Sequence, residues 1–506
     1  MKSPIGPAHH ALNRTVAEAS DAAEVSAMGA QAVARWARAT SDAVAVVEGE
    51  ASWSYKTLAA NIGQAAEMLR MRGLQPGMIF GIQCDIQYLH LILMLAAEAA
   101  GAVQFSMAPS DLMFDSELSD RCDLICVEAM TAPLADHPRA ILLSRDTIGE
   151  LARIEVAGDG IAALSADWPP GEIIRIATTS GTTGARKFVC YTRRALQNAG
   201  NGIEHILDGR RERYDFVSFY RFNLMGTYSH AMLALTHGKS IFFCTDTDFL
   251  PVIRARQACH TMLVVGDVHR VAAEAARLPR RADSCSIRVL GAALPPRLRA
   301  ALRASLTNDI VSTYSSNETR FISIVGDDGV GTLFPDISVR IVDDDGNPRN
   351  MGEPGTIMVR SPRMGSHYLW NDGETRKHFI DGWFRINDAG VMPEPGKLIV
   401  LGRTDDMINT GGIKLAPYPI EERIRVVEGV SDAILMSHTG ESGVAELHVF
   451  IERDDPAFDE GIGQALVTLL RRHVTTFAAH YATRFPRTQT GKVRRNVLRD
   501  RLSQGE

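Results

Sequence analysis

The sequence predicts an α/β protein built from a large N-terminal domain and a small C-terminal domain. From about residue 51 to residue 290, short apolar strands alternate with helical segments, which is typical of α/β sheets. Strands dominate from about residue 331 to residue 401, so this stretch is expected to form a β-rich subdomain. A polar crossing at 402–406 precedes a smaller α+β unit. We therefore expect one domain at 1–402 and another at 403–506.

The first elements are read from their apolar patterns and from the turns between them. In order, we expect a helix ending near Met71, a turn at 73–77, a strand at 78–82, a helix at 89–100 and a strand at 101–105. The longest apolar stretch, 91–103, is interrupted by Glu98 and is too short to cross a bilayer. A buried helix leading into a strand explains it better, and the N-terminus lacks the apolar core of a signal peptide.

The later elements follow from the same kind of evidence. We expect strands at 172–177 and 188–191, a helix at 192–207, and strands at 261–265 and 287–290 that each precede a glycine and a helical pattern. Turn residues at 344–347 and 394–396 divide the β-rich stretch. With these elements, helices and strands alternate through much of the large domain, as expected for an α/β fold.

Composition, net charge and cysteine spacing limit the classes of protein to which the chain can belong. The 506 residues are 45% hydrophobic and 23% charged, as in an ordinary globular enzyme, and suffice for roughly three or four units of about 150 residues. The formal net charge of −6 argues against a nucleic-acid-binding protein. The 7 cysteines are scattered without a CxxC pair, and no His and Cys spacing indicates a transition-metal site. We expect a cytoplasmic protein without a membrane segment.

The most informative segment is the polar run from Thr178 to Lys187, between two expected strands. It contains hydroxyl side chains, two glycines and a terminal lysine. Glycines let the backbone approach a ligand, hydroxyls and amides donate hydrogen bonds to anionic oxygens, and lysine adds a point charge. The run therefore predicts a phosphate-binding loop. Its glycines are too close together for a Walker loop, and a flexible linker is the alternative.

Four further segments carry charged residues in polar turns. Glu318 follows Tyr314, and Asp388 follows an aromatic pair. Arg403 and Asp405 lie in the polar crossing at 402–406, and Lys492 follows a glycine near the C-terminus. Each segment also has a simpler interpretation. In order, these are a surface acid for Glu318, a helix or turn cap for Asp388, a solvated hairpin for Arg403 and Asp405, and one charge of a basic helix for Lys492.

The order of these five motifs resembles that of the adenylate-forming superfamily, which includes acyl-CoA synthetases, adenylation domains of peptide synthetases and luciferases. The resemblance runs from about Trp53 to Arg495. It implies an ATP- and Mg²⁺-dependent ligase that joins a small carboxylic acid to a thiol through an acyl-adenylate. CoA is the expected acceptor; loading of a phosphopantetheine carrier protein is the alternative. A third reading is a nucleotide-binding protein without catalysis.

The resemblance assigns the nucleotide site. The phosphates would be held by Thr179, Ser180, Gly181, Thr182, Thr183, Gly184 and Lys187, and the nucleoside by Gly291, Ala292, Ala293, Tyr314, Asn317, Asp388 and Arg403. Glu318 would bind Mg²⁺, a hard cation that prefers oxygen ligands.

The resemblance also assigns the moving parts and the acyl site. Lys492 would reach the reacting carboxylate, and Asp405 would be the hinge about which the mobile small domain turns. Gly411 and Gly412 would border the thiol tunnel, and Asn223 and Gly226 would line the acyl pocket.

The sequence departs from the family pattern at several positions. Arg186 replaces the usual proline of the phosphate loop, Ser315 and Asn317 replace glycine and threonine, and Ser312 replaces a frequent asparagine. None of these changes removes a charged group. Polar Asn223 stands at the usual aromatic or histidine position, which favours a smaller or more polar acid than a long-chain fatty acid. The alternative is that Asn223 only satisfies backbone groups.

Overall fold

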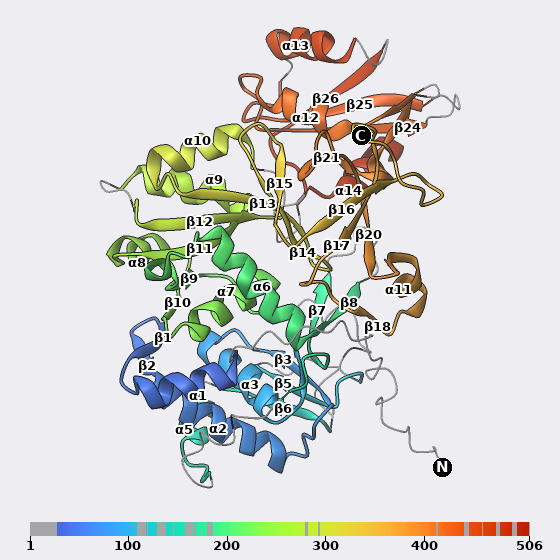
Figure 1. Ribbon diagram of the computed structural model, residues 1–506. Helices are drawn as coiled ribbons and strands as arrows, with labels where there is room; N and C mark the ends of the chain where they lie inside the picture. The colour runs from blue at the N-terminus through green and yellow to red at the C-terminus, as the bar shows by residue number, and fades with distance from the viewer. Residues whose placement is uncertain are drawn as a thin grey trace.

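The computed structural model describes most of the chain (Figure 1). The described residues are 28–108, 118, 120–128, 138–144, 146–156, 164, 168–179, 186–278, 282–291, 294–410, 413–439, 445–457, 459–471, 476–487 and 493–504. They form two large sheets and two small ones. Mixed helices and strands through the large N-terminal part confirm the predicted α/β class.

The first large sheet contains the strands on both sides of the polar run. Its order is β18 (His367–Leu369), β8 (Lys187–Thr192), β7 (Ile173–Thr179), β4 (Val103–Ser106), β3 (Ile79–Gln83), β5 (Leu124–Val127) and β6 (Ala140–Leu142). Neighbours from β7 to β6 run parallel, whereas β8 is antiparallel to both β7 and β18. The strands expected near 78–82, 101–105, 172–177 and 188–191 are therefore present.

The second large sheet joins the middle of the chain to the β-rich stretch. Its order is β16 (Ser338–Val342), β17 (Gly355–Arg360), β20 (Trp383–Val391), β21 (Lys397–Arg403), β15 (Gly331–Leu333), β14 (Arg320–Val325), β13 (Ile310–Ser316), β12 (Cys285–Leu290), β11 (Cys259–Val264), β9 (Phe216–Ser218), β10 (Ile241–Phe243), β1 (Val44–Glu48) and β2 (Ala51–Ser54), with β19 (Phe379–Ile380) beside β20. Pairing is parallel from β1 through β13 and antiparallel from β13 through β16.

Helices accompany both sheets in the large N-terminal part. They are α1 (Ala30–Ala39), α2 (Tyr55–Met71), α3 (Gln87–Ala99), α5 (Thr147–Leu151), α6 (Arg193–Ile206), η4 (Arg211–Arg213), α7 (Met225–Thr236), α8 (Phe249–Ala255), α9 (Val265–Ala276), α10 (Pro296–Ser305) and α11 (Asp372–His378). The side chain of Ser54 accepts from the backbone N–H of Thr57 and so caps α2, and Thr192 caps α6 in the same way. Helix α11 interrupts the β-rich stretch and was not predicted.

Helix α3 shows why the longest apolar stretch does not span a membrane. All of its residues are buried, and it packs against α2 and its own sheet before the chain enters β4. Glu98 is buried with it, and desolvation raises the pKa of its carboxyl to about 7. The prediction of a buried helix that leads into a strand is confirmed. Among the described residues, no helix has the length and apolar character needed to cross a bilayer.

The remaining elements have their own cores. They are η5 (Thr404–Asp406), the hairpin β22 (Ile408–Thr410) and β23 (Ile413–Leu415), α12 (Pro417–Arg425), a sheet of β24 (Asp432–Thr439), β25 (Ala445–Glu452) and β26 (Phe477–Ala482), α13 (Glu460–Leu470) and α14 (Arg495–Gln504). Their buried apolar residues form two clusters apart from the rest. Figure 1 shows these elements at one end of the molecule.

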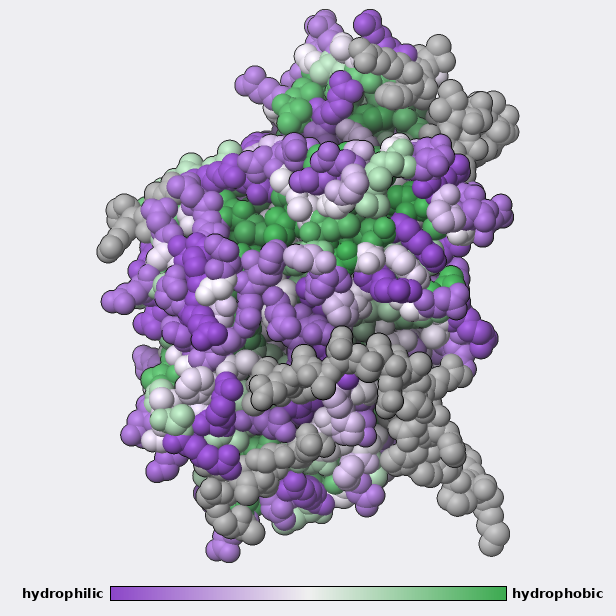
Figure 2. All heavy atoms as spheres, viewed as in Figure 1, coloured by the Kyte–Doolittle hydropathy of each residue, from purple (hydrophilic) through white to green (hydrophobic). Residues whose placement is uncertain are grey.

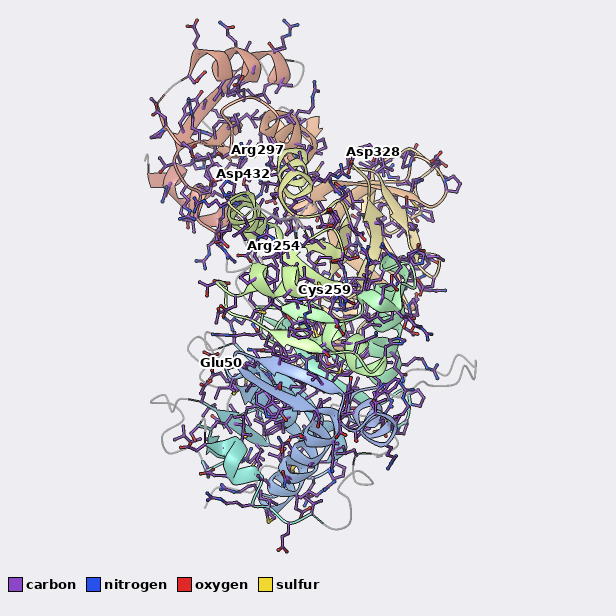
Figure 3. All side chains as sticks on the ribbon, turned by 90° about the vertical axis from the view of Figure 1, so that its left-hand side faces the viewer. Glu50, Arg254, Cys259, Arg297, Asp328 and Asp432 are labelled. Carbon is purple, nitrogen blue, oxygen red and sulfur yellow. The ribbon has the colours of Figure 1, made fainter. Side chains whose placement is uncertain are left out.

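The C-terminal elements meet the rest of the chain beside α10. Arg297, labelled in Figure 3, donates a hydrogen bond to the carbonyl of Val430 at 3.3 Å. The face drawn in Figure 2 is largely polar, but apolar side chains are visible in a band below the C-terminal elements. The contact between the two parts is therefore partly polar and leaves apolar surface next to it.

Two glycines of α6 test how tightly this helix packs. A Cβ at Gly202 would lie 2.8 Å from Phe321 Cδ2 and 2.8 Å from Arg363 Nε, whereas a Cβ at Gly200 would meet nothing within 4 Å. We expect Gly202→Ala to lower the free energy of unfolding by about 1–3 kcal/mol because it overpacks the site. Gly200→Ala should instead raise it by about 0.5–1 kcal/mol. Urea denaturation measures both; equal effects would contradict the packing described.

Candidate active site

The polar run connects two adjacent strands at an edge of the first sheet. Thr179 at the end of β7 and Lys187 at the start of β8 are directly paired across the antiparallel ladder. The ladder therefore fixes both ends of the segment, as expected for a loop between ordered elements. The predicted phosphate-binding residues Ser180, Gly181, Thr182, Thr183 and Gly184 lie outside the described residues.

Lys187 projects from this edge towards α11. Its ammonium group forms an ion pair with the carboxylate of Glu374 and lies 5.0 Å from the centre of the Tyr368 ring. The same carboxylate lies 3.3 Å from His378 Nε2. The hydrogen bond with Lys187 is the main reason that the pKa of Glu374 is lowered from its ordinary value. Lys187, which is predicted to bind phosphate, is thus paired with Glu374, a carboxylate of the same chain.

The sequence contains a signal for α11 that the prediction missed. Asn371 caps the helix by accepting from the backbone N–H of Glu374 at 3.0 Å, three residues later. Acidic residues occupy the first turn and basic residues the last, which is the favourable arrangement along a helix dipole. Gly373 within the first turn obscured this pattern, because glycine disfavours helix interiors.

Glu318 lies in the turn between β13 and β14 and faces the same tyrosine. The Tyr368 hydroxyl donates to Glu318 Oε1 at 2.9 Å, and the backbone N–H of Gly365 donates to the Glu318 carbonyl at 2.8 Å. Burial raises the pKa of Tyr368 above its ordinary value, so its hydroxyl keeps its proton at neutral pH. Lys187 and Glu318 therefore contact one side chain, the first through its ring and the second through its hydroxyl.

Asn317 links the acidic turn to the polar run. Its side-chain amide donates to the carbonyl of Thr178 at 3.3 Å, while its own carbonyl accepts from the hydroxyl of Tyr191. Tyr191 is buried on β8. The end of the second sheet is thereby attached to β7 and β8 of the first sheet, next to the predicted phosphate loop.

A second group of predicted residues gathers where β13, β20 and β21 meet. The Tyr314 hydroxyl donates to Asp388 Oδ2 at 2.5 Å, and Arg403 NH1 lies 3.8 Å from Asp388 Oδ1. Asp388 and Arg403 are direct partners across β20 and β21. Arg403 also donates to Asp405 Oδ2 at 3.0 Å, at the first residues of the C-terminal part. Burial, with Asp388 as the next cause, raises the pKa of Tyr314 well above its ordinary value.

The predicted acyl-site residues lie at the start of α7. Asn223 is half-buried just before the helix, and Gly226 is in its first turn. A Cβ at Gly226 would lie 2.5 Å from Met262 Sδ and 3.0 Å from Leu290 Cδ1, so α7 closely approaches β11 and β12 here. Gly291 follows β12 with a φ of 93°, which suits glycine. Ala292 and Ala293 lie outside the described residues.

The C-terminal predictions are described only in part. Lys492, Gly411 and Gly412 lie outside the described residues, whereas the segments on either side of them are described. β22 and β23 pair on the two sides of residues 411 and 412, and an isolated bridge joins Arg487 to Val493 around Lys492. Asp405 is an exposed residue of η5.

The described residues contain no group of three or more His, Cys, Asp or Glu side chains that could hold a metal ion. Glu318, the residue predicted to bind Mg²⁺, therefore presents one carboxylate beside Tyr368 without a second described ligand grouped with it. This fits Mg²⁺, which commonly takes one or two protein carboxylates and completes its coordination with phosphate oxygens and water.

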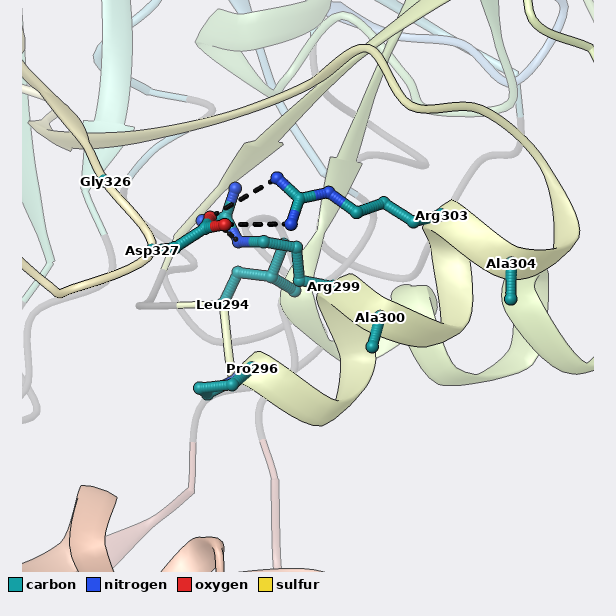
Figure 4. A pocket seen from close by; sticks show the side chains of 8 residues that line it. All are labelled: Leu294, Pro296, Arg299, Ala300, Arg303, Ala304, Gly326 and Asp327. Carbon is teal, nitrogen blue, oxygen red and sulfur yellow. Dashed lines mark hydrogen bonds and ion pairs between the residues drawn. The ribbon is translucent and has the colours of Figure 1, made fainter.

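A cavity of about 490 Å³ lies elsewhere, between α10 and the turn at residues 326–327 (Figure 4). There Asp327 pairs with Arg299 at 3.0 Å and with Arg303 at 2.8 Å. None of the predicted site residues lines it, so this surface cavity is separate from the group around Tyr368.

Comparison with known proteins identifies the family of the chain. The model of the AMP-binding enzyme family matches residues 33–369. The chain belongs to the AMP-binding enzyme family. Among similar curated proteins, the long-chain-fatty-acid–CoA ligase FadD13 of Mycobacterium tuberculosis is 26% identical over 399 residues, covering 74% of this chain and 78% of that one. Indoleacetate–CoA ligase of Aromatoleum aromaticum is 28% identical over 371 residues, 69% and 71% of the two chains.

Solved structures of this fold cover almost the whole chain. ATP-bound MatB from Rhodopseudomonas palustris has a TM-score of 0.79 at 23% identity and covers 94% of this chain and 99% of its own. The AMP complex of O-succinylbenzoate–CoA synthetase from Bacillus subtilis has a TM-score of 0.78 at 18% identity, with coverages of 93% and 98%. The expected adenylate-forming fold is confirmed.

The ion pair between Lys187 and Glu374 predicts an abnormal titration. Because the folded-state pKa of Glu374 is lowered, the stability gained from its ionised form is present above the unfolded-state value and is lost as pH falls through the lowered pKa. In an NMR titration we expect Glu374 to have a midpoint below its ordinary value of 4.5, which Lys187→Met shifts back upwards. Lys377→Met is the matched control, since Lys377 is more exposed and lies 3.6 Å away. An equal shift in both variants would contradict the assignment.

Proposed function

We propose that the protein is an AMP-forming ligase that activates a carboxylic acid with ATP and transfers the acyl group to CoA. The family match and the relatives named as CoA ligases support this activity. The observation that carries the proposal is the convergence of Lys187 and Glu318 on Tyr368 beside the polar run. Cationic, acidic and hydroxyl groups from distant parts of the chain meet beside the polar run that is predicted to hold the phosphates.

The first half-reaction joins two anions, so charge must be neutralised and geometry fixed. Thr179 to Gly184 would hold the β- and γ-phosphates with backbone and hydroxyl donors, and the Lys187 ammonium would add charge. Glu318 would hold Mg²⁺, which neutralises the phosphates when bound. The Tyr368 hydroxyl keeps Glu318 Oε1 in place, so the carboxylate is oriented before the ligand arrives.

The nucleoside half of ATP would lie between the two groups of residues. Asp388 and Arg403 would contact the ribose hydroxyls, the Tyr314 ring would pack on adenine, and Gly291 to Ala293 would form the opposite wall. Tyr314 and Arg403 hold the Asp388 carboxylate from two sides. Asn317, which is tied to Thr178, would donate its amide near the α-phosphate.

Residues 403–506 would act as the small mobile domain, with Asp405 as the hinge. In the adenylating position, Lys492 would reach the acyl carboxylate. A rotation about the hinge would then remove Lys492 and let a thiol approach between Gly411 and Gly412. The location of Asp405 in the short segment after β21 supports a hinge there.

CoA is favoured over a carrier protein, because the relatives are named as CoA ligases. We place the protein in the cytoplasm, since all 7 cysteines are free thiols as reducing conditions require. The half-buried Asn223 supports a short or polar acid as substrate.

Pyrophosphate exchange tests the proposed activity directly. A panel of acids from acetate to palmitate is incubated with ATP, Mg²⁺ and labelled pyrophosphate, and active acids are then given CoA or a holo-carrier protein. We expect exchange with at least one acid of about ten carbons or fewer and an acyl-CoA product in the mass spectrum. Absence of exchange with every acid would leave a nucleotide-binding protein without catalysis.

Lys492 gives a prediction that separates the two half-reactions. Lys492→Ala should slow adenylation by roughly 100-fold or more, because a cation that stabilises the transition state is lost. Thioester formation from an added acyl-adenylate should be nearly unchanged. Single-turnover assays of each step measure this; an equal loss in both steps refutes the role given to Lys492.

Glu374 competes with phosphate for Lys187 in this proposal. Glu374→Gln removes the competing charge; a partly exposed ion pair is worth about 1 kcal/mol, so the KM for ATP should fall by roughly fivefold. Asp372→Asn, in the same helical turn, serves as the control and should leave the KM nearly unchanged. A higher KM for Glu374→Gln would mean that the carboxylate instead orients Lys187 for binding.

A further inference from the structure

Three arginines are buried around the first half of α7. Arg175 on β7, Arg288 on β12 and Arg320 on β14 have exposed fractions of 1%, 2% and 4%. Each is among the most costly side chains to bury, because a charged group loses its hydration. All three contact the helix or the segment that leads into it.

Their contacts within the described residues are to neutral groups. Arg175 donates to Gln104 Oε1 at 2.7 Å and to the Phe222 carbonyl at 2.6 Å, and Arg320 NH2 donates to the Met225 carbonyl at 3.0 Å and to Ser229 Oγ at 2.7 Å. Arg288 NH1 lies 3.0 Å from His230 Nε2, and its NH2 donates to Thr313 Oγ1 at 3.3 Å. No described carboxylate forms an ion pair with any of the three.

Other buried arginines show that this lack of a counter-ion is not general. Arg363 pairs with Asp336 at 2.6 Å, and Arg299 pairs with Asp327 at 3.0 Å. Each of these two guanidinium groups reaches a carboxylate at the surface, whereas Arg288 does not. Arg193, which is 2% exposed, also makes no ion pair within the described residues, so a missing counter-ion is not confined to the arginines around α7.

Arg288 is the least compensated of the three. Its Nε makes no hydrogen bond, and its guanidinium stacks 3.5 Å from the centre of the Phe321 ring, which supplies only a weak cation–π attraction. Burial lowers the pKa of Arg288 well below its ordinary value, and the neighbouring Arg320 and Arg363 lower it further. An anion beside Arg288 would offset both the desolvation and the repulsion.

Arg288 lies on β12, the strand whose Leu290 contacts the predicted acyl-site residue Gly226. Leu290, two residues later on the same face of β12, contacts the position of a Cβ on Gly226. Gly291, expected on the nucleotide side, is three residues from Arg288, or about 10 Å along a strand. An acyl group that extends from Gly291 along β12 in the direction of Leu290 therefore points towards Arg288, beside which His230 of α7 lies.

We propose that the acyl substrate is a short dicarboxylic acid, whose distal carboxylate binds Arg288 while its other carboxylate is adenylated. This inference rests on the proposed function and specifies its substrate class. Arg320, hydrogen-bonded to the first turn of α7, adds positive potential beside Arg288. A guanidinium is suited to this role because it binds a carboxylate through two parallel hydrogen bonds.

Matched pairs of acids test the proposal with the unmodified protein. Pyrophosphate exchange is measured with succinate against butanoate, glutarate against pentanoate, and adipate against hexanoate. We expect at least one diacid to exceed its monoacid in kcat/KM by ~100-fold or more, since a buried charged group left without a partner is strongly disfavoured. Higher values for every monoacid would overturn the inference and leave the ligase activity intact, whereas no exchange with any acid would contradict both.

Variants then assign the preference to Arg288. Arg288→Met should lower kcat/KM for the diacid by ~100-fold or more and leave the monoacid nearly unchanged or improved. Arg299→Met, which removes a buried arginine outside the site, should keep the diacid preference. Retention of that preference in Arg288→Met would overturn the assignment.

Thermal unfolding tests the contact between the diacid and Arg288 without depending on enzymatic activity. Arg288→Met removes a buried charge together with its contacts to His230 and Thr313, so the Tm of the unliganded variant is measured first and serves as its reference. The preferred diacid, with ATP, should raise the Tm of the unmodified protein more than that of the variant. Equal ligand-induced shifts would contradict a contact with Arg288. Arg288→Lys, which keeps one charge, should fall between the two.

Discussion

The contact of Tyr368 with both Lys187 and Glu318 is the constraint on which the site depends. Lys187 begins β8, Glu318 follows β13 and Tyr368 belongs to β18, so three separated strands must be in register for the contact to form. β18 pairs with β8 and thereby fixes two of the three. The turn that carries Glu318 is fixed through Asn317, whose side chain donates to the carbonyl of Thr178 on β7 and whose own carbonyl accepts from the hydroxyl of Tyr191 on β8. The contacts that join the two large sheets thus also hold Lys187 and Glu318 against the same tyrosine.

Electrostatics then differs between the two ends of the proposed substrate path. At the nucleotide end, cations are paired: Lys187 with Glu374, and Arg403 with Asp388 and Asp405. These pairs hold the cations in place, and in the proposed function they would be exchanged for contacts with the nucleotide. At the end proposed to hold the distal carboxylate, Arg288 and Arg320 meet only neutral groups among the described residues. The proposed diacid would supply the negative charge that these two arginines do not receive from the described residues.

Much of the fold could be predicted, because local signals agree with tertiary structure. The apolar run of α3, the capping residues Ser54 and Thr192 and the glycine after β12 each determine a short segment. Helix α11 was missed because Gly373 weakens its pattern, and Glu374 was missed as the partner of Lys187 because nearly two hundred residues separate them. Arg288 was likewise invisible in the sequence, since an arginine in a strand gives no indication of whether it is buried or paired. Long-range pairing and desolvation are properties of the packed chain.

A double-mutant cycle on Lys187 and Glu318 tests the central claim most directly. Lys187→Met, Glu318→Gln and the double variant are compared in pyrophosphate exchange with ATP, Mg²⁺ and the best acid. If both side chains act on one triphosphate, the effects on kcat/KM are not additive, and the double variant loses less than the product of the single losses. Independent, multiplicative losses would place the two residues on different ligands and contradict the account.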